Sequence, residues 1–347
     1  MMITFKGIDR FYQQHQEQIQ YNFDQVMRKS SGTDGDFCRS VESKICAITG
    51  RKHAAVVSSA TSALMIAMIS LNLNKKCIAA PNYSYVASVN QIAFRNRLNF
   101  VDVDNNGIAN NYPNADAYIT VSLYGNTPDY NNLSNTTTIA DCSQSLGSLY
   151  RGNPDGSFGD IAVFSFNENK PVPIFGTQGV IVWDRDELTN PIISASKNGK
   201  LGRNSPVTGL GINAEPFELQ ASLIDIGLDY VDNWQQRRET IHCYYREQFA
   251  DLPIDIIEPE SYCVSNRHKF VILLKDRKSF VNYMQDEVQV QMHYTDKFSN
   301  TWHQIRSHYP NTDRFCNQAI SLPNHQWLTD TEVEKIAEKT KKFFKTG

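Results

Sequence analysis

The chain has 347 residues, of which 41% are hydrophobic, and a formal net charge of −3 at pH 7. This length predicts two domains, and the apolar fraction is large enough for a packed core, which excludes bulk disorder. The charges are mixed along the chain without a long basic stretch, so nucleic acid is not expected as a partner.

Neither the N-terminus nor the cysteines indicate export. The first 20 residues lack the apolar stretch of a signal peptide, and no apolar run reaches the roughly 18–20 residues of a membrane span. The seven cysteines are scattered and contain no CxxC pair, which is typical of reduced thiols and not of a disulfide framework or a zinc site. We therefore expect a cytoplasmic protein with no membrane contact and no bound metal.

The first two thirds of the chain alternate between apolar runs and helix-length segments. Residues 8–30 and 37–49 have helical composition or spacing, and an apolar run at 54–59 leads into a helix that opens at Ala60. A further helix is expected at 86–96, and further strands at 76–85, 98–104, 116–125, 137–144, 161–166 and 179–184. Apolar strands that alternate with such segments predict an α/β domain with a largely parallel sheet.

The pattern changes after about residue 210. A long helical stretch covers 216–249, and a smaller α+β segment follows, with apolar runs at 269–274 and 288–294 and a helical tail at 330–344. We expect a large domain over residues 1–235, which includes the N-terminal helical segment, and a small α+β domain over residues 236–347.

Chemically distinctive residues follow several expected strands. In an open parallel sheet, ligands bind at the carboxyl ends of the strands. The residues delivered there are Ser59, Ala60 and Thr61; Tyr83 and Tyr85; Tyr124 and Gly125; Asp141 and Gln144; and Ser165 and Lys170. The expected site thus contains one amine, one carboxylate, hydroxyls at a helix start, and aromatic rings.

Pyridoxal phosphate is a cofactor that needs all of these groups. It requires a lysine amine, an acid against its pyridine nitrogen, a cradle for its phosphate and a ring to stack on. Taken singly, each feature is more often structural: a solvated lysine, a capping aspartate or a packed tyrosine. Their conjunction favours pyridoxal phosphate, with Lys170 and Asp141 as the catalytic pair.

Two other features have structural interpretations. Residues 209–214, GLGINA, match the dinucleotide pattern G-x-G-x-x-A, but the segment before them is polar and contains Pro206. Because no strand leads into this turn, a dinucleotide site is not expected. Glu218 begins a helix and is expected to form an ion pair or a cap.

Seven segments in order resemble the DegT/DnrJ/StrS group of fold type I, pyridoxal-phosphate-dependent nucleotide-sugar aminotransferases. The segments are GRKHAAVVSSATSALMIAM, APNYSYVASVNQIAF, LYGNTPD, ADCSQSLGSLYRGNPDGSFGDIAVFSFNENK, GINAEPFELQASL, QMHYTDKFSNTWH and AISLPNHQWLTDTEVEKI. The resemblance covers roughly residues 30–345. It implies a seven-stranded, mostly parallel sheet flanked by helices, and a smaller C-terminal α+β domain.

The resemblance also implies roles for the matched residues around the cofactor ring. Lys170 is implied to hold pyridoxal phosphate through its amine and to move a proton between substrate and cofactor. Asp141 is implied to pair with the pyridine nitrogen, Gln144 to lie by the phenolic oxygen, and Tyr85 to stack on the ring.

The phosphate would be held by a second group of residues. The backbone amides of Ala60 and Thr61 and the Ser165 hydroxyl are implied to bind it, helped by the positive end of the helix. Asn213 matches an asparagine that reaches the phosphate from the neighbouring subunit, so the resemblance implies a homodimer with shared active sites.

On the substrate side, the resemblance makes His293 and Tyr294 candidate contacts. A hydrogen-bonded histidine on a strand is the alternative for His293, and the same two interpretations apply to His303. The implied reaction moves an amino group from L-glutamate to a keto group of a UDP-, dTDP- or GDP-linked deoxy sugar. The products would enter polysaccharide biosynthesis, for example of O-antigen, or glycoconjugate biosynthesis.

Two alternatives stay open. The segments NAEP at 213–216 and PVPIFGTQG at 171–179 depart from the group's patterns, which motivates a non-catalytic regulator that binds pyridoxal phosphate or a sugar. The group also contains sugar dehydratases, in which a histidine replaces the lysine. Because Lys170 is present, transamination is the favoured interpretation.

Overall fold

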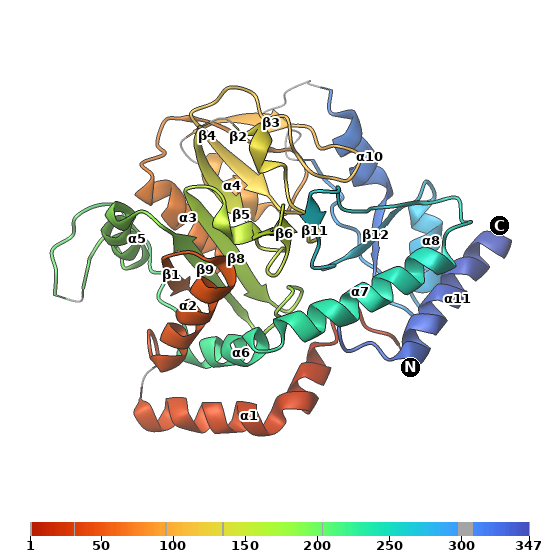
Figure 1. The fold of residues 1–347 in the computed structure, drawn as a ribbon, viewed down its shortest axis with the longest axis horizontal. Helices are drawn as coiled ribbons and strands as arrows, with labels where there is room; N and C mark the ends of the chain where they lie inside the picture. The colour runs from red at the N-terminus through yellow and green to blue at the C-terminus, as the bar shows by residue number, and fades with distance from the viewer. Residues whose placement is uncertain are drawn as a thin grey trace.

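A computed structural model describes residues 2–30, 32–93, 96–133, 135–202, 204–297 and 308–346. A seven-stranded sheet forms the centre of the molecule, with the order β1-β9-β8-β5-β4-β2-β3 (Figure 1). Its strands are β1 (His53–Val57), β2 (Cys77–Pro81), β3 (Arg97–Val101), β4 (Ala117–Val121), β5 (Thr137–Asp141), β8 (Ile161–Asn167) and β9 (Thr177–Trp183). The predicted α/β class is confirmed.

The sheet is mostly parallel, as predicted. Strands β3, β2, β4, β5 and β8 are parallel to their neighbours in this order, whereas β9 runs antiparallel to both β8 and β1. The register pairs Asp141 of β5 with Val163 of β8. The carboxyl ends of β5 and β8 therefore lie at the same edge of the sheet, where the sequence predicts the site.

Alternate residues of each strand pack on opposite faces of the sheet, as strand geometry requires. In β8, Ile161 and Val163 belong to one buried apolar cluster, whereas Ala162, Phe164 and Phe166 belong to the other. Because both faces are covered, the central strands are apolar almost throughout.

Helices supply the other half of each cluster. The first cluster includes buried residues of α3 (Ala60–Ser70) and α5 (Thr189–Ser196). The second includes residues of α1 (Ile8–Lys29), α2 (Asp36–Thr49), α6 (Glu218–Leu228) and the start of α7 (Val231–Gln248). The short α4 (Ala87–Ala93) follows β2. These bounds confirm the helices predicted in the first 250 residues, except that residues 94 and 95 of the helix expected at 86–96 lie outside the described residues.

The C-terminal part has its own sheet, of order β10-β12-β13, beside the long α7 (Figure 1). Its elements are β10 (Asp255–Ile256), β12 (Phe270–Leu273), α8 (Arg277–Met284), α10 (Pro310–Gln318), β13 (Ala319–Leu322) and α11 (Asp330–Thr346). A third apolar cluster joins these elements to the second half of α7 and also contains Ile3 from the N-terminus. The division of the chain near residue 235 stays a prediction.

A second small sheet, β11-β6-β7, consists of β6 (Leu149–Tyr150), β7 (Asn153–Pro154) and β11 (Cys263–Val264) and connects the two parts of the chain. The short 3-10 helices are η1 (Tyr130–Asn132), η2 (Asp155–Ser157) and η3 (Asp186–Leu188). Across the residues that the structure describes, no helix combines the length and apolar composition that a bilayer span requires. All seven cysteines are free thiols.

Glu218 caps a neighbouring helix, which is one of the two roles expected for it. Its carboxylate accepts hydrogen bonds from the backbone N–H groups of Gly35 at 2.9 Å, Phe37 at 2.6 Å and Cys38 at 3.2 Å. These groups lie at the start of α2, where N–H groups lack partners within the helix and the helix dipole favours a negative charge. Glu218 thereby fixes α6 against α2.

Candidate active site

Lys170 lies just beyond β8, at the rim of the sheet. Its backbone N–H donates to the Asn167 carbonyl at 3.1 Å, so a tight turn carries the lysine away from the strand, and Pro171 restricts the backbone behind it. Burial lowers the pKa of the Lys170 amine from its ordinary value to about 8, although the charge of Asp141 opposes the shift. Roughly a tenth of the amine is therefore neutral at pH 7 and available as a nucleophile or base, far more than for an ordinary lysine.

Asp141 ends β5 and is only 5% exposed. Its Oδ2 accepts a hydrogen bond from the Ser88 hydroxyl of α4 at 2.7 Å, and its Oδ1 accepts one from the Ser143 backbone N–H at 3.1 Å. Both carboxylate oxygens are thus held in place by short contacts. The side chain is set as a fixed negative charge at the edge of the sheet that also carries Lys170.

One cavity of about 290 Å³ brings these residues together. The predicted site residues that line it are Ala60, Thr61, Tyr85, Asp141, Gln144, Ser165, Lys170, His293 and Tyr294. Other polar side chains in its wall are Ser59, Ser88, Ser122, Ser143, Asn167, Asn169 and Thr177. A larger cavity of about 750 Å³ lies beside α3 and α5, but its lining is mainly apolar and contains none of the predicted residues. The smaller cavity is therefore the candidate active site.

The start of α3 forms one end of this cavity. Ser59 is the N-cap residue, and its hydroxyl accepts a hydrogen bond from the Ser62 backbone N–H at 3.0 Å. A Cβ atom at Gly179 of β9 would lie 2.4 Å from the Ala60 nitrogen, so only glycine lets β9 approach the helix this closely. The helix start, with Ser165 and Thr177 in the wall beside it, can cradle an anion through backbone N–H groups and hydroxyls.

Gln144, Tyr85 and Tyr294 form another part of the cavity wall. The Gln144 Oε1 accepts a hydrogen bond from the Tyr124 backbone N–H at 3.0 Å, and its Nε2 donates to the Tyr294 hydroxyl at 3.2 Å. The Tyr85 ring centroid lies 6.1 Å from that of Tyr294, and Tyr85 is 53% exposed. Tyr85 thus lines the cavity with about half of its surface open, which suits a stacking role.

His293 lines the cavity but lies in no regular strand, so the strand expected around it is wrong. Around this position the chain makes only isolated bridges, including one between Gln291 and Ser321. The His293 Nδ1 is 2.9 Å from the Ser321 hydroxyl, and its carbonyl accepts a hydrogen bond from the Tyr124 hydroxyl at 2.6 Å. Tertiary hydrogen bonds therefore hold this segment in place of a continuous strand ladder. His303 lies outside the described residues.

Three residues around the cavity were not predicted from the sequence. His268 and Lys269, directly before β12, line it beside Lys170. Phe5 packs against the same region, because its ring centroid is 4.5 Å from the Lys269 amine and 5.9 Å from the His293 ring. A lysine at the start of an otherwise apolar strand was the available signal for Lys269. The sequence carried no signal that the N-terminus would reach the site.

Asn213 does not line the cavity of its own chain. It is exposed and bridges Lys197 at the base of the segment that follows α5. In Figure 1 this segment extends away from the sheet. The placement is compatible with the expectation that Asn213 serves a neighbouring subunit, which stays a prediction.

The residues present fit pyridoxal phosphate. The Lys170 amine can be neutral, the Asp141 carboxylate shares its cavity, and the α3 start offers backbone donors where no acidic side chain stands. Asp141 is the sole acidic residue in the described lining. The amine, the carboxylate and the group of anion-binding donors are thus supplied by different residues that line one cavity, as this cofactor requires.

Comparison with known proteins identifies relatives along almost the whole chain. The sequence model of the DegT/DnrJ/EryC1/StrS aminotransferase family matches residues 13–341. The UDP-4-amino-4,6-dideoxy-N-acetyl-beta-L-altrosamine transaminase of Campylobacter jejuni is 27% identical, over 89% of this chain and 92% of its own. The dTDP-3-amino-3,6-dideoxy-alpha-D-galactopyranose transaminase of Aneurinibacillus thermoaerophilus is 26% identical, over 99% of both chains.

The fold has solved counterparts. The structure of NtdA from Bacillus subtilis with bound cofactor PMP matches with a TM-score of 0.88 and 22% identity, over 99% of this chain and 85% of that one. At this identity the likeness concerns the fold alone.

Proposed function

Because the chain belongs to the DegT/DnrJ/EryC1/StrS aminotransferase family, we propose that it is a pyridoxal-phosphate-dependent nucleotide-sugar aminotransferase. It would transfer an amino group from L-glutamate to a keto group of a nucleotide-linked deoxy sugar, for polysaccharide biosynthesis, such as that of O-antigen, or for glycoconjugate biosynthesis. The observation that carries this proposal is the Lys170 amine of lowered pKa, which shares one cavity with the fixed Asp141 carboxylate. The relatives named for UDP- and dTDP-linked sugars support a nucleotide-sugar acceptor.

The cofactor, when bound, supplies an electron sink conjugated with the amino nitrogen that is being transferred. The chain's own groups do the rest. Lys170 would hold the cofactor through its Nζ and would then carry a proton at that atom, for which its pKa near 8 suits it. Asp141, held by Ser88 and the Ser143 amide, would keep the pyridine nitrogen protonated.

The cavity walls orient the reactants. The amides of Ala60 and Thr61 and the Ser165 hydroxyl would bind the phosphate, and Tyr85 would cover the ring. His293 is a candidate contact for the substrate. Its pKa is lowered well below the ordinary value, mainly by burial and to a smaller extent by the charges of Lys269 and Lys170. His293 would therefore meet the substrate as a neutral imidazole, able to exchange hydrogen bonds with sugar hydroxyls.

Absorption spectroscopy tests the proposal. Purified protein with added pyridoxal phosphate should develop the absorption band of the lysine-bound cofactor. L-Glutamate should replace that band with the spectrum of the amine form, and a panel of UDP-, dTDP- and GDP-linked keto sugars should restore it. Lys170→Ala should abolish both the band and turnover, and a Lys170→Ala protein that still transaminates would contradict the assignment.

The same experiment separates the alternatives. A non-catalytic regulator would show the band or sugar binding but no response to glutamate. A sugar dehydratase would consume a sugar nucleotide without a stoichiometric amino donor. The lysine at position 170 favours transamination over both, because its amine is suited to proton transfer at the cofactor.

We also propose that the enzyme is a cytoplasmic homodimer with shared active sites. The segment after α5 exposes Leu201, Val207 and Leu210 by 44%, 65% and 67%, beside the apolar cavity of about 750 Å³. Clustered exposed apolar side chains of this kind are typical of an interface. Asn213 at the base of the segment would then reach the partner's cofactor. Seven free cysteine thiols support a reducing compartment.

A further inference from the structure

A second amine lies next to Lys170. Lys269 lines the candidate active site, and its Nζ lies 4.5 Å from the centroid of the Phe5 ring. Among the residues that the structure describes, no carboxylate lies within ion-pair distance of this ammonium group. Lys6, the neighbouring cation, differs because it pairs with Glu168 at 2.6 Å. Lys269 therefore places a second basic group, without a carboxylate partner among the described residues, beside the catalytic lysine.

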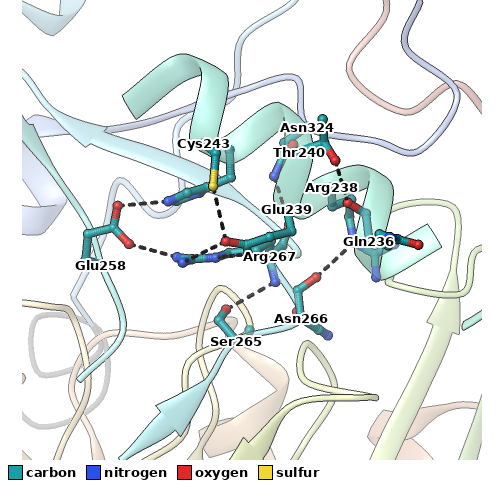
Figure 2. Close-up of polar contacts among 12 residues, drawn as sticks. Gln236, Arg238, Glu239, Thr240, Cys243, Glu258, Ser265, Asn266, Arg267 and Asn324 are labelled. Carbon is teal, nitrogen blue, oxygen red and sulfur yellow. Dashed lines mark hydrogen bonds and ion pairs between the residues drawn. The ribbon is translucent and has the colours of Figure 1, made fainter. Parts of the chain in front are cut away.

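Contacts of the preceding residues, Asn266 and Arg267, hold the backbone that carries Lys269. Arg267 forms ion pairs with Glu239 of α7 at 2.6 Å and with Glu258 at 2.8 Å (Figure 2). The Asn266 side chain donates to the carbonyls of Gln144 and Leu146. These contacts clamp the two residues before His268 and Lys269, so the Lys269 side chain extends into the site from a rigid segment.

A small cavity of about 30 Å³ lies behind the active site. Lys170, Asn169, His268 and Lys269 line both cavities, so the two are adjacent. This volume holds roughly one or two water molecules or one carboxylate group, but no diphosphate. A small group projecting from a reactant at Lys170 can therefore reach it.

The lining of this small cavity contains the Lys6–Glu168 ion pair, and also basic side chains that no carboxylate of the described residues pairs with. Arg238 of α7 lines it, is almost completely buried, and donates to the Pro171 carbonyl at 3.3 Å and to the Gln326 Oε1 at 3.1 Å. Burial lowers the pKa of Arg238 to about 9, and no carboxylate in the described part of the chain pairs with it. Burial, and repulsion by Lys170 and Lys6, likewise lower the pKa of Lys269 well below its ordinary value.

Gln326 adds an unused donor. Its Oε1 is occupied by Arg238, and its buried Nε2 has no hydrogen-bond partner among the described residues. A buried donor without a partner destabilises the protein, and a buried charge without a partner does so by more. An anionic group in the small cavity would relieve both costs, since it offers two acceptor oxygens and a negative charge.

We propose that Lys269 and the Gln326 amide form a carboxylate-binding subsite beside Lys170. The inference rests on the proposed aminotransferase function and deepens it. The carboxylate can belong to the amino-acid donor, whose α-carboxylate is one bond from the reacting carbon, or to an acidic sugar. The cofactor phosphate has its own cradle at the start of α3, on other residues, and is too large for the small cavity.

Binding of unreactive carboxylates tests the subsite. Titration calorimetry with the protein loaded with pyridoxal phosphate would use glutarate, which lacks an amine, and UDP-glucuronate, which carries a sugar carboxylate. Lys269→Met should weaken binding of one of these probes at least tenfold, Gln326→Leu about three- to tenfold, and Lys269→Arg less than threefold. Lys275→Met is the matched control, with an expected change below twofold, because Lys275 is exposed and lines neither cavity.

The outcomes are distinct. A loss of affinity confined to glutarate assigns the subsite to the donor. The L-glutamate concentration that half-saturates the single-turnover rate should then rise as well. A loss confined to UDP-glucuronate assigns it to an acidic sugar. Unchanged binding of both probes by Lys269→Met overturns the inference, and so does a Lys269→Met protein that folds but no longer holds the cofactor.

Failure of the proposed function would look different. A wild-type protein that binds glutarate through Lys269 but converts no glutamate would contradict the aminotransferase proposal and leave the subsite intact. If Lys269→Met does not fold, the Gln326→Leu and Lys269→Arg proteins decide the matter through the same two titrations.

Discussion

Lys170 and Lys269 share a cavity, and their neighbours give them different chemistry. Lys170 faces Asp141, whose charge opposes the effect of burial, so the pKa of its amine falls only to about 8. Lys269 meets other cations and an aromatic ring, and no carboxylate among the described residues offsets its burial. One amine is thus adapted for covalent chemistry, and the other for an anion that arrives with the substrate.

The pKa of Lys170 predicts how cofactor capture depends on pH. A lysine with a lowered pKa becomes neutral as pH rises through about 8, so the neutral fraction grows below that pH and is nearly complete above it. The rate at which added pyridoxal phosphate forms its lysine-bound band should rise about tenfold per unit between pH 6 and 7.5 and level off above about pH 8.5. Stopped-flow absorbance measures this rate.

Nα-acetyl-lysine is the control, because it reacts with the same free cofactor but has an amine of ordinary pKa. Ionisation of the cofactor therefore affects both reactions equally. Its rate should keep rising beyond pH 9. A protein profile that parallels this control would contradict the lowered pKa.

At the scale of the elements, the contact between β9 and α3 sets the shape of the anion cradle. Gly179 pairs with Val57 on one side and with Ser165 on the other, so it lies in the interior of the sheet and directly beneath the start of α3. The missing side chain lets the Ala60 amide approach the strand. The proposed phosphate cradle is therefore a property of two elements and not of the helix alone.

Gly179→Ala should lower the free energy of unfolding by about 1–3 kcal/mol and weaken pyridoxal phosphate binding at least tenfold, because the new methyl group displaces the Ala60 amide. Gly32→Ala is the matched control, since a Cβ atom there meets nothing within 4 Å. Fluorescence-monitored cofactor titration and urea unfolding measure the two effects. Wild-type affinity in a stable Gly179→Ala protein would show that the cradle lies elsewhere.

Because the Glu218 carboxylate of α6 caps the start of α2, we expect it to contribute to the stability of the protein. Glu218→Gln should lower the free energy of unfolding by about 1–3 kcal/mol, because an amide nitrogen would face backbone N–H donors and the charge at the helix start would be lost. Urea unfolding measures the change. Glu215→Gln, three residues earlier and exposed, should alter it by less than 0.5 kcal/mol. Equal effects at both positions would refute the capping role.

At the scale of the whole molecule, the active site depends on distant parts of the chain, and under our proposal on a second chain. The N-terminal Phe5, the β8 turn, the β12 start and the segment at 293–294 all meet around the same cavity. The exposed segment after α5 carries Asn213 away from this cavity. A site completed by the partner would need dimerisation before it could bind the cofactor fully.

Mixed dimers test this sharing. Asn213→Ala alone should weaken pyridoxal phosphate binding about tenfold, and Lys170→Ala alone should abolish the lysine-bound band. In a dimer with one chain of each kind, a shared site implies that the Asn213→Ala chain receives an intact Asn213 from its partner. Half of the sites should then bind the cofactor with wild-type affinity, as absorbance titration of purified mixed dimers would measure.

If Asn213 acts within its own chain, the mixed dimer has no intact site and binds as weakly as the Asn213→Ala protein. That result would refute the shared site without affecting the roles of Lys170 and Asp141.

The sequence by itself determined the order of the elements, the α/β class and most of the residues around the cavity. Alternation of apolar residues is a local property, and the carboxyl ends of parallel strands converge wherever such a sheet forms, so Asp141 and Lys170 could be placed together without coordinates. Only the tertiary structure brought Phe5, Lys269, Arg238 and Gln326 to the same lysine and set Glu218 on a helix start more than 180 residues away in the chain. These contacts join segments whose local sequences are ordinary strands, helices and turns, so no periodicity or motif encodes them. They arise from packing, which also decides which buried charges find partners and which are left for a ligand.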